Sequence, residues 1–285
     1  MKDVTNAMRA HILTAAVPYI KQYTDQYVVV KYGGNAMIDE ELKKSVMKDL
    51  MLLQLVGVKV VLVHGGGPAI NSTLDAMKIE SRFANGLRVT DEATMDVVQM
   101  VLAGKVNKGL VADLTDLGGK VIGLCGVDGN MIQVHKQNEE LGYVGSVDTI
   151  DTSIIHDVIS RGYIPVISSI GMGADGKTYN INADTVAAKI AGALKAETMV
   201  AMTNIDGVLK DVHDPESLIS KITMAEAEQL KVDGIIAGGM IPKVDCCLEA
   251  IEAGAQKVFI INGEIPHAIL IELLTDEGLG TMFVA

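Results

Sequence analysis

The sequence has no tryptophan, only three cysteines and few basic residues, with 24 Lys+Arg against 36 Asp+Glu and a formal charge of −12. The cysteines (Cys125, Cys246 and Cys247) lack C-x-x-C spacing, which excludes a disulfide framework and a zinc site and favours a reducing compartment. The acid excess argues against nonspecific binding to nucleic acid or anionic lipid, because both require a basic protein surface.

Long hydrophobic runs are also missing. No apolar stretch reaches the ~18 residues that a membrane span requires. The apolar stretch after Lys2 and Arg9 is short and is interrupted by His11 and Pro18. We therefore predict that it is not a signal peptide. The six histidines show no H-E-x-x-H or similar spacing, so no dedicated metal site is predicted. We expect a cytoplasmic protein without membrane or nucleic-acid partners.

Glycine is the residue in excess, at 29 of 285 positions, or about a tenth against a usual ~7%. The other proportions, 49% hydrophobic and 21% charged, are those of a globular chain long enough for a large core. The surplus indicates places where backbone must turn tightly or approach a ligand closely.

Continuous apolar runs, each ending in small or polar residues and followed by a helical pattern, recur along the chain. They begin at Tyr27, Val60, Val121, Ile164, Met199 and Val258. This alternation predicts an α/β fold, a three-layer αβα sandwich around a largely parallel central sheet. In such sheets ligands bind beyond the carboxyl ends of the strands, where many of the glycines lie.

An additional helix is predicted ahead of the first strand. Residues 3–20 place Val4, Met8, Ile12 and Ile20 on one face at helical spacing. Pro18 lies inside this stretch and should kink or end the helix. We expect this helix to pack across the domain or to reach a neighbouring subunit.

Two nucleotide-binding motifs are considered and rejected. Gly171 to Thr178 matches G-x-x-x-x-G-K-T, but a P-loop needs a helix at its Lys-Thr, and the next helical pattern begins near Asp184. We therefore predict a surface hairpin that turns at Asp175-Gly176. The G-x-G-x-x-G fingerprint fails at Ile70, which argues against a nicotinamide-dependent oxidoreductase.

Glycines and a lysine follow the first two predicted strands. Lys31 is followed by Gly33-Gly34, and His64 by three glycines that end at Gly67. A lysine beside glycine amides can bind an anion through charge and backbone donors together. A solvated lysine and a flexible loop are the plainer alternatives, and we interpret His64 as structural rather than as a base.

Further charged residues stand at predicted helix starts. Arg88 precedes a helix for which Thr90 is the expected N-cap, and it can grip a carboxylate bidentately or form a surface salt bridge. Asp184 follows Asn180 closely and could also be only a cap. Lys243 comes directly after a proline at a helix start, an unfavourable place for a cation unless an anion binds there.

The candidate residues include no nucleophile–base pair of the Ser/His or Cys/His kind. They combine three cations, glycine loops, one acid and two amides. This combination fits phosphoryl transfer, where the protein mainly positions reactants and stabilises charge.

In their order along the chain, these motifs resemble those of the amino acid kinase family, over nearly the whole sequence. The Asn-Gly-Leu-Arg-Val-Thr-Asp stretch is similar to the branch that phosphorylates N-acetyl-L-glutamate. The motifs are Lys31-Tyr-Gly-Gly, His64-Gly-Gly-Gly-Pro, Asn85-Gly-Leu-Arg-Val-Thr, Ser168-Ser-Ile-Gly, Asn180-Ile-Asn-Ala-Asp, Thr203-Asn-Ile-Asp-Gly-Val and Gly239-Met-Ile-Pro-Lys.

The resemblance implies a reaction in which ATP phosphorylates the γ-carboxylate of N-acetyl-L-glutamate, the second step of arginine synthesis. It implies that Lys31 and Lys243 stabilise the transferred phosphoryl group and that Asp184 holds both lysines. Mg²⁺ would be bound through the ATP phosphates. The implied acceptor ligands are the amides of Gly66 and Gly67 with Arg88 and Asn180, and the implied nucleotide residues are Gly33, Thr203, Asn204, Asp206, Gly207, Leu209 and Ile236.

The N-terminal helix and the tail with His267, Glu277 and Gly280 are similar to the arginine-inhibited branch of the family. The resemblance there implies a hexamer, a trimer of dimers joined through that helix, with L-arginine bound beside it. A nitrogen-signalling protein is a further candidate partner. A simple helical arm and a C-terminal turn are the plainer alternatives.

The expected division of the chain is a helical segment 1–26, an acetylglutamate-binding and dimerising lobe 27–194, and an ATP-binding lobe 195–285. Two alternatives for the function stay open. One is another carboxylate or carbamate kinase of the same family. The other is a non-catalytic arginine sensor, against which the joint presence of Lys31, Asp184 and Lys243 speaks.

Overall fold

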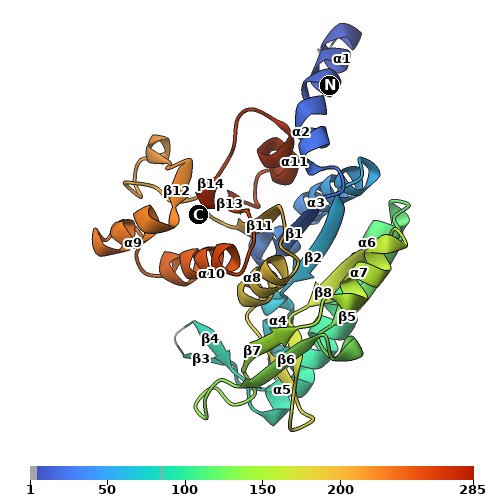
Figure 1. Ribbon diagram of the computed structural model, residues 1–285. Helices are drawn as coiled ribbons and strands as arrows, with labels where there is room; N and C mark the ends of the chain where they lie inside the picture. Colours follow the sequence, from blue (N-terminus) through green and yellow to red (C-terminus); the bar gives the residue numbers. More distant parts are fainter. Residues whose placement is uncertain (1–4, 85) are drawn as a thin grey trace.

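A central sheet of eight strands runs through the molecule in the order β12-β14-β13-β11-β1-β2-β8-β5 (Figure 1). The computed structural model describes residues 5–84 and 86–285, so Val4 and Asn85, both part of the predicted motifs, lie outside the described residues. The strands are β1 (Tyr27–Tyr32), β2 (Lys59–His64), β5 (Val121–Cys125), β8 (Ile164–Ser168), β11 (Thr198–Thr203), β12 (Lys221–Thr223), β13 (Lys257–Asn262) and β14 (Thr281–Val284).

Neighbouring strands of this sheet are parallel except β13 and β14, which are antiparallel. All six apolar runs of the sequence form strands here, which confirms the predicted sheet. The central strands are largely apolar because both faces are covered. In β1, Val29 belongs to one hydrophobic cluster and its neighbours Val28 and Val30 to another, and all three are fully buried.

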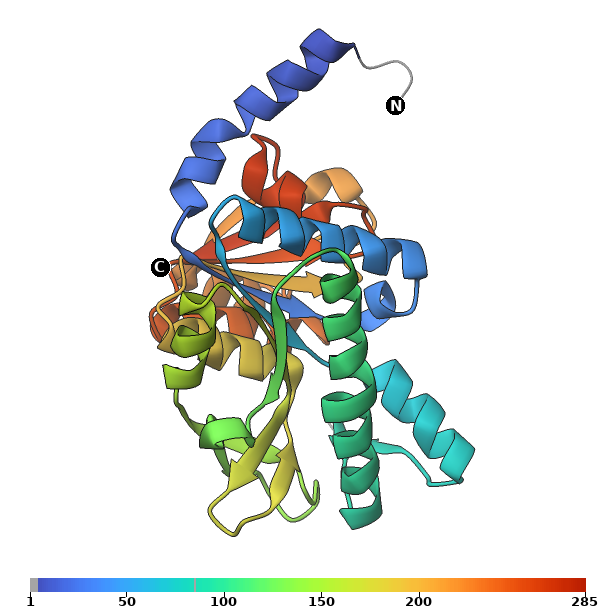
Figure 2. The ribbon, with the colours of Figure 1, turned by 90° about the vertical axis from the view of Figure 1, so that its right-hand side faces the viewer.

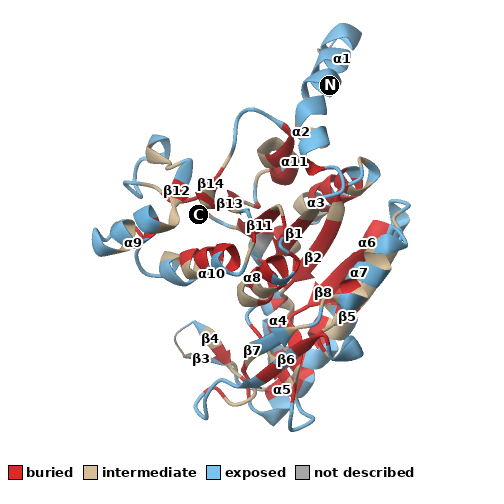
Figure 3. Cartoon of the chain, in the orientation of Figure 1, coloured by how far each residue is buried: buried red, intermediate tan, exposed pale blue. Residues whose placement is uncertain are grey.

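Helices cover both faces and complete the predicted αβα sandwich (Figures 2 and 3). On one face, α3 (Glu40–Leu55), α6 (Asn107–Asp116) and α11 (Ala268–Leu274) share a core with the sheet. On the other face lie α7 (Ser153–Ser160), α8 (Ala183–Ala193), α9 (Met224–Val232) and α10 (Met240–Glu252). Cys246 and Cys247 belong to α10, and Cys247 is fully packed in the core.

A second sheet has the strand order β10-β9-β6-β7, with β6 (Ile132–Lys136), β7 (Gly145–Ile150), β9 (Ile170–Gly173) and β10 (Thr178–Asn180). The β9–β10 hairpin turns through Gly176, whose φ of +76° suits glycine. The predicted hairpin is therefore confirmed. Because α8 begins only at Ala183, the G-x-x-x-x-G-K-T match does not form a P-loop.

A nearly continuous helical rod precedes β5. It consists of α5 (Glu92–Gln99), the π-helical segment η2 (Met100–Val106) and α6. The prediction of Thr90 as N-cap is wrong by one residue. Asp91 caps α5, because its carboxylate accepts a hydrogen bond from the Thr94 N–H, whereas the Thr90 hydroxyl is buried and donates to the Arg88 carbonyl.

The N-terminal arm has the predicted kink. It divides at Ala16 into α1 (Asn6–Ala15) and α2 (Val17–Tyr23), and Pro18 lies in the first turn of α2, where its missing N–H costs no hydrogen bond. Figure 2 shows α1 pointing away from the body of the protein. None of the helices in the described residues has the length and apolar character to span a membrane.

The remaining elements connect these layers. They are α4 (Gly67–Met77), the two-stranded ribbon of β3 (Arg82–Ala84) and β4 (Leu87–Val89), and the short 3₁₀ helices η1 (Gly34–Met37), η3 (Asp128–Asn130) and η4 (Pro215–Ser217).

Candidate active site

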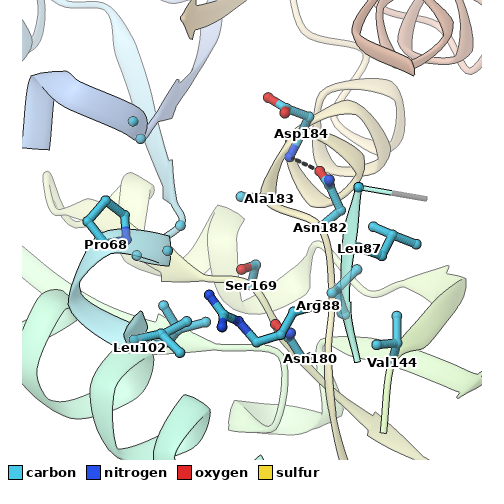
Figure 4. A pocket seen from close by; sticks show the side chains of 18 of the residues that line it. Pro68, Leu87, Arg88, Leu102, Val144, Ser169, Asn180, Asn182, Ala183 and Asp184 are labelled. Carbon is cyan, nitrogen blue, oxygen red and sulfur yellow. Dashed lines mark hydrogen bonds between the residues drawn. The ribbon is translucent and has the colours of Figure 1, made fainter. Parts of the chain in front are cut away.

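The carboxyl ends of β1, β2 and β8 and the start of α8 enclose a cavity of about 320 Å³ (Figure 4). Parallel strands place these ends at one edge of the sheet, as expected for a ligand site. Seven predicted site residues line this cavity, and they are Lys31, Gly33, Gly66, Gly67, Arg88, Asn180 and Asp184.

Asp184 is the centre of the charge arrangement. Its two carboxylate oxygens face two lysines, with Lys31 Nζ at 3.0 Å and Lys243 Nζ at 3.9 Å. Burial would raise the pKa of this carboxyl, but the two ammonium groups outweigh burial and hold the pKa below its usual value. The acid is therefore ionised, and the three groups together carry a net positive charge that favours an anion between them.

Local structure fixes Asp184 in this place. Asn182 is the N-cap of α8, and its side-chain oxygen accepts hydrogen bonds from the N–H groups of Asp184 and Thr185. Figure 4 draws the first of these bonds. The carboxylate then lies in the first helical turn, where the helix dipole also favours a negative charge.

Lys243 approaches the same acid from α10. It lies in the first turn of that helix, as the sequence predicts. With Asp184 and Thr203 it lines a small neighbouring cavity, and with Asp184 and Leu87 it lines a wider groove of about 640 Å³. Asp184 is thus shared by the 320 Å³ cavity and by the spaces next to α10.

The glycine loop Gly65–Gly67 lies between β2 and α4 at the floor of the first cavity. Gly66 is the N-cap of α4, so the first amides of that helix have no carbonyl partner within it. A Cβ atom on Gly66 would lie 2.7 Å from Leu102 Cδ2, closer than packed atoms can be. A side chain at position 66 would have to displace Leu102, because η2 packs directly against the loop.

Arg88 is held on several sides before any ligand arrives. Its guanidinium donates hydrogen bonds to the Ser81 hydroxyl and, at 2.6 Å, to the Asn71 side-chain oxygen. It also lies 4.7 Å from the centre of the Phe83 ring. Burial lowers the pKa of Arg88 from its usual value, yet a guanidinium stays charged at neutral pH. Figure 4 shows it pointing into the cavity beside Asn180.

The predicted nucleotide residues divide into two groups. Thr203 ends β11 and lines the small cavity with Lys243, and Asn204 and Asp206 are exposed in the loop that follows. In contrast, Ile236 is packed in the hydrophobic core, and a Cβ on Gly207 would lie 2.5 Å from Thr281 Oγ1. Leu209 is half-buried and forms an isolated bridge with Leu218.

Two residues that contact predicted site residues, Asn262 and Asn71, were not among the predictions. Asn262 ends β13 and donates a hydrogen bond of 2.8 Å to the Asp206 carboxylate. Because β13 neighbours β11 in a parallel sheet, their ends share one edge, and this signal could have identified Asn262. Asn71, which holds Arg88, lies on a helix far away in sequence and leaves no such signal.

None of the three candidate regulatory residues lines the cavities described above. His267 Nδ1 is 2.6 Å from the buried carboxylate of Asp49 on α3. Glu277 is exposed, whereas Gly280 is buried where a Cβ would lie 2.0 Å from the Ile260 carbonyl oxygen. The hydroxyl of Tyr19 on α2 donates to Asp276, so the arm and the loop that carries Glu277 are in contact.

Comparison with known proteins gives the classification. The model of the amino acid kinase family matches residues 26–262. The chain belongs to this family. Within the described residues, no group of three or more His, Cys, Asp or Glu side chains is arranged to hold a metal ion.

Relatives within the family match the chain along nearly its whole length. The acetylglutamate kinase of Brachyspira hyodysenteriae is 52% identical over 285 residues, with 99% of both chains covered. The acetylglutamate kinase of Caldanaerobacter subterraneus subsp. tengcongensis is 50% identical, with 96% of this chain and 93% of that protein covered. That of Nostoc punctiforme is 50% identical, with 98% and 94% covered.

Solved structures support the same fold. An N-acetylglutamate synthase from Neisseria gonorrhoeae, complexed with coenzyme A and N-acetyl-glutamate, superposes with a TM-score of 0.85 at 26% identity. The match covers 97% of this chain but only 63% of that longer one. A carbamate kinase from Giardia lamblia bound to AMP-PNP, at 16% identity and a TM-score of 0.67, covers 91% of this chain and 98% of its own, and shares the fold.

Proposed function

We propose that the protein is an acetylglutamate kinase of the cytoplasm, which transfers the γ-phosphoryl group of ATP to the γ-carboxylate of N-acetyl-L-glutamate. The products are ADP and N-acetyl-L-glutamyl 5-phosphate, in the second step of arginine synthesis. The observation that carries the proposal is the Lys31–Asp184–Lys243 cluster between the two cavities. The identity of the substrate is inferred from the relatives described above, which are acetylglutamate kinases.

The two lysines are proposed to stabilise the phosphoryl group from opposite sides as it moves. Negative charge on its oxygens must be balanced throughout the transfer, and preorganised ammonium groups do this without rearranging. Asp184 keeps both lysines aimed at the same place. The acceptor's γ-carboxylate is already ionised at neutral pH, so the reaction needs no general base, in agreement with the absence of a nucleophile–base pair among the candidate residues.

The acceptor is proposed to bind in the 320 Å³ cavity. Arg88, fixed by Asn71 and Ser81, would hold the α-carboxylate together with Asn180. The amides of Gly66 and Gly67 would hold the γ-carboxylate at the start of α4, where N–H groups and the helix dipole favour an anion. This places the reacting oxygen on the side of the cavity that Lys31 and Asp184 line.

ATP is proposed to lie against the second lobe, with its phosphates directed toward Asp184 and Lys243. Gly33, Thr203, Asn204 and Asp206 would contact the nucleotide. Gly207, Leu209 and Ile236 would shape that site through packing. Mg²⁺ would enter on the ATP phosphates, whose charge it offsets, because both Asp184 oxygens already face lysines.

A coupled ADP-release assay tests this function directly. The protein is incubated with ATP and Mg²⁺ and with N-acetyl-L-glutamate, L-glutamate or carbamate in parallel. We expect turnover with the acetylated substrate and little with the other two. Turnover with L-glutamate or carbamate alone would assign the chain to a different kinase of the family, and none with any acceptor would favour the non-catalytic sensor.

Regulation by L-arginine is part of the same proposal. The arm, α11 and the 275–280 loop lie together, and Glu277 offers a carboxylate to a guanidinium. Every residue of α1 is exposed, including the apolar Met8, Ile12 and Leu13, which supports pairing of arms between dimers to form a hexamer. The chain is proposed to divide into the N-terminal arm 1–26, an acceptor-binding lobe 27–194 and an ATP-binding lobe 195–285. Binding of a nitrogen-signalling protein stays a prediction.

A further inference from the structure

His64 is a buried titratable residue to which the proposed reaction assigns no role. It ends β2, it is 0% exposed, and the glycine loop Gly65–Gly67 follows it immediately. Its side chain lies on the face of the sheet that packs against α6, below the loop and outside the cavity. A polar ring in this position needs hydrogen-bond partners, and the identity of those partners indicates what the residue does.

Both ring nitrogens of His64 have a partner. Nδ1 lies 2.8 Å from the carbonyl oxygen of Gly65, and Nε2 lies 3.1 Å from the side-chain nitrogen of Asn107. A carbonyl oxygen only accepts, so Nδ1 must carry the proton that it donates to Gly65. The neutral ring then accepts at Nε2, and burial, which lowers the pKa of His64 to about 4, keeps it neutral.

The orientation of Asn107 independently fixes the same tautomer. Its side-chain nitrogen also faces the carbonyl oxygens of Val166 at 2.8 Å and Leu124 at 3.3 Å, and both require a donor. Its side-chain oxygen accepts from Lys108 Nζ at 3.0 Å. Its two N–H groups donate to the Val166 carbonyl and to His64 Nε2, the longer Leu124 contact sharing one of them, so a proton on Nε2 would meet another donor.

The packing around Asn107 leaves it little freedom. A Cβ atom on Gly123 of β5 would lie 1.9 Å from the Asn107 side-chain oxygen, so glycine is required opposite it. Asn107 is also the first residue of α6, directly after the π-helical segment η2 whose Leu102 packs against Gly66. One stretch of helix thus supports the loop from two sides, and π-helical turns are often found at functional sites.

The hydrogen bond to Gly65 has a consequence for the next amide. In a planar trans peptide the carbonyl of one residue and the N–H of the following residue point in opposite directions. When His64 holds the Gly65 carbonyl toward the buried side, the Gly66 N–H is directed the other way, and Gly66 lines the cavity. The N–H of Gly65 is fixed as well, because it donates to the Tyr32 carbonyl at 3.1 Å.

We propose that His64, held in its Nδ1–H tautomer by Asn107, is a positioning residue that aims the Gly66 amide at the anionic acceptor. This inference rests on the proposed kinase function. His64 touches neither substrate. It acts through one peptide plane, so that an N–H donor is already in place where charge develops on the acceptor and the phosphoryl group.

Two substitutions of similar size and polarity separate this role from simple core packing. An asparagine side chain places its nitrogen near the position of imidazole Nδ1, so His64→Asn can keep the bond to Gly65. The glutamine nitrogen corresponds to Nε2, so His64→Gln loses that bond. We expect His64→Gln to lower kcat with N-acetyl-L-glutamate by at least about tenfold and His64→Asn to stay within about threefold of wild type.

The KM for ATP serves as the internal control and should change little in either variant, because the glycine loop faces the acceptor. Equal losses in the two variants, or near-wild-type activity of His64→Gln, would overturn the proposal. If the wild-type protein shows no kinase activity, the proposed function fails instead, and the two failures are distinct.

A second measurement needs no variant and no activity. The ¹⁵N chemical shifts of the His64 ring in the wild-type protein report which nitrogen carries the proton. We expect Nδ1 protonated, Nε2 unprotonated and no titration between pH 5.5 and 8. A ring protonated at Nε2 alone would contradict the proposed orientation of the Gly66 amide.

Discussion

The carboxyl edge of the sheet and helix α1 depart from ordinary burial in opposite ways. At the edge, Lys31 and Arg88 are buried, although charged side chains normally stay in water. In α1, Met8, Ile12 and Leu13 are 55%, 58% and 72% exposed, although such side chains normally leave water. One region buries charge and the other exposes apolar surface.

The two regions differ in whether the same chain supplies contact partners for their unusual side chains. The buried charges have partners already, since Lys31 faces Asp184 and Arg88 has Asn71 and Ser81. What the edge can still take is a small anion. An exposed apolar helix is satisfied only by an apolar surface of comparable length, which a second protein chain can supply. The two anomalies therefore indicate two kinds of partner.

The largest effect is expected at the cationic edge. Replacing Lys243 by alanine removes one of the two ammonium groups proposed to stabilise the phosphoryl group, and kcat should fall by roughly 10²-fold or more. The thermal transition should change little, because the lysine is only loosely paired with Asp184. Steady-state kinetics with both substrates varied measures this, with exposed Lys221→Ala on β12, outside the cavities described above, as the control. A near-wild-type kcat would remove Lys243 from its assigned role.

Asp49 tests whether a buried charge must indicate a ligand. It is 0% exposed on α3, and burial raises its pKa to about 6 although His267 lies against it. Because the folded pKa exceeds the unfolded value of 3.8, the folded state binds the proton more tightly. The carboxyl group therefore contributes most to stability below pH 4, and this contribution is lost as pH rises through 6.

Relative to Asp49→Asn, the wild-type free energy of unfolding should consequently fall by about 2 kcal/mol between pH 4 and 7. Urea denaturation of both proteins at several pH values gives this difference. Parallel pH profiles for the two proteins would show that Asp49 is ionised as easily in the folded state as in water.

An intermediate effect is expected for Arg88→Lys. Lysine keeps the charge but lacks the planar fork that Asn71 and Ser81 hold in place. The KM for N-acetyl-L-glutamate should rise by about tenfold, corresponding to roughly one charged hydrogen bond, while the KM for ATP stays constant. Steady-state kinetics gives the two KM values, and isothermal titration with each substrate gives the corresponding binding affinities. Equal weakening of both would mean that Arg88 supports the fold and not the acceptor.

The smallest effect on activity is expected at the other region. Removing residues 1–22 takes away α1 and most of α2 but no residue of the cavities. The kcat should stay within about twofold of wild type, while the particle mass falls to that of a dimer and arginine sensitivity decreases. Sedimentation analysis and inhibition curves measure these changes. A hexamer that survives the truncation would refute the role of the arm.

Strong local patterns in the sequence identified the six apolar strands, the kinked arm and the Asp175-Gly176 turn. Lys31, Asp184 and Lys243 were each identified because they stand at a strand end or helix start, whereas their joint arrangement was implied by the family resemblance. By contrast, β6 and β7 were not predicted, since both strands have several exposed residues and their pairing is irregular at Gln133/Val134.

Other features depend on contacts that no local pattern records. The cap of α5 is Asp91 instead of the expected Thr90. The support of the glycine loop by Asn107 requires α6 to pack under β2, which is a matter of tertiary structure alone. Sequence therefore identified the residues at the cavity more readily than the residues behind them.

The position of β14 determines the order in which the sheet can form during synthesis. β12 is made well before β13 and β14, yet β14 lies between the two and pairs with both. Thr281 of β14 also accepts a hydrogen bond from the Val208 N–H, next to the proposed nucleotide loop. On the ribosome, β12 therefore has no neighbour to join until β14 has emerged, and the nucleotide lobe is completed after translation of nearly the whole chain described here.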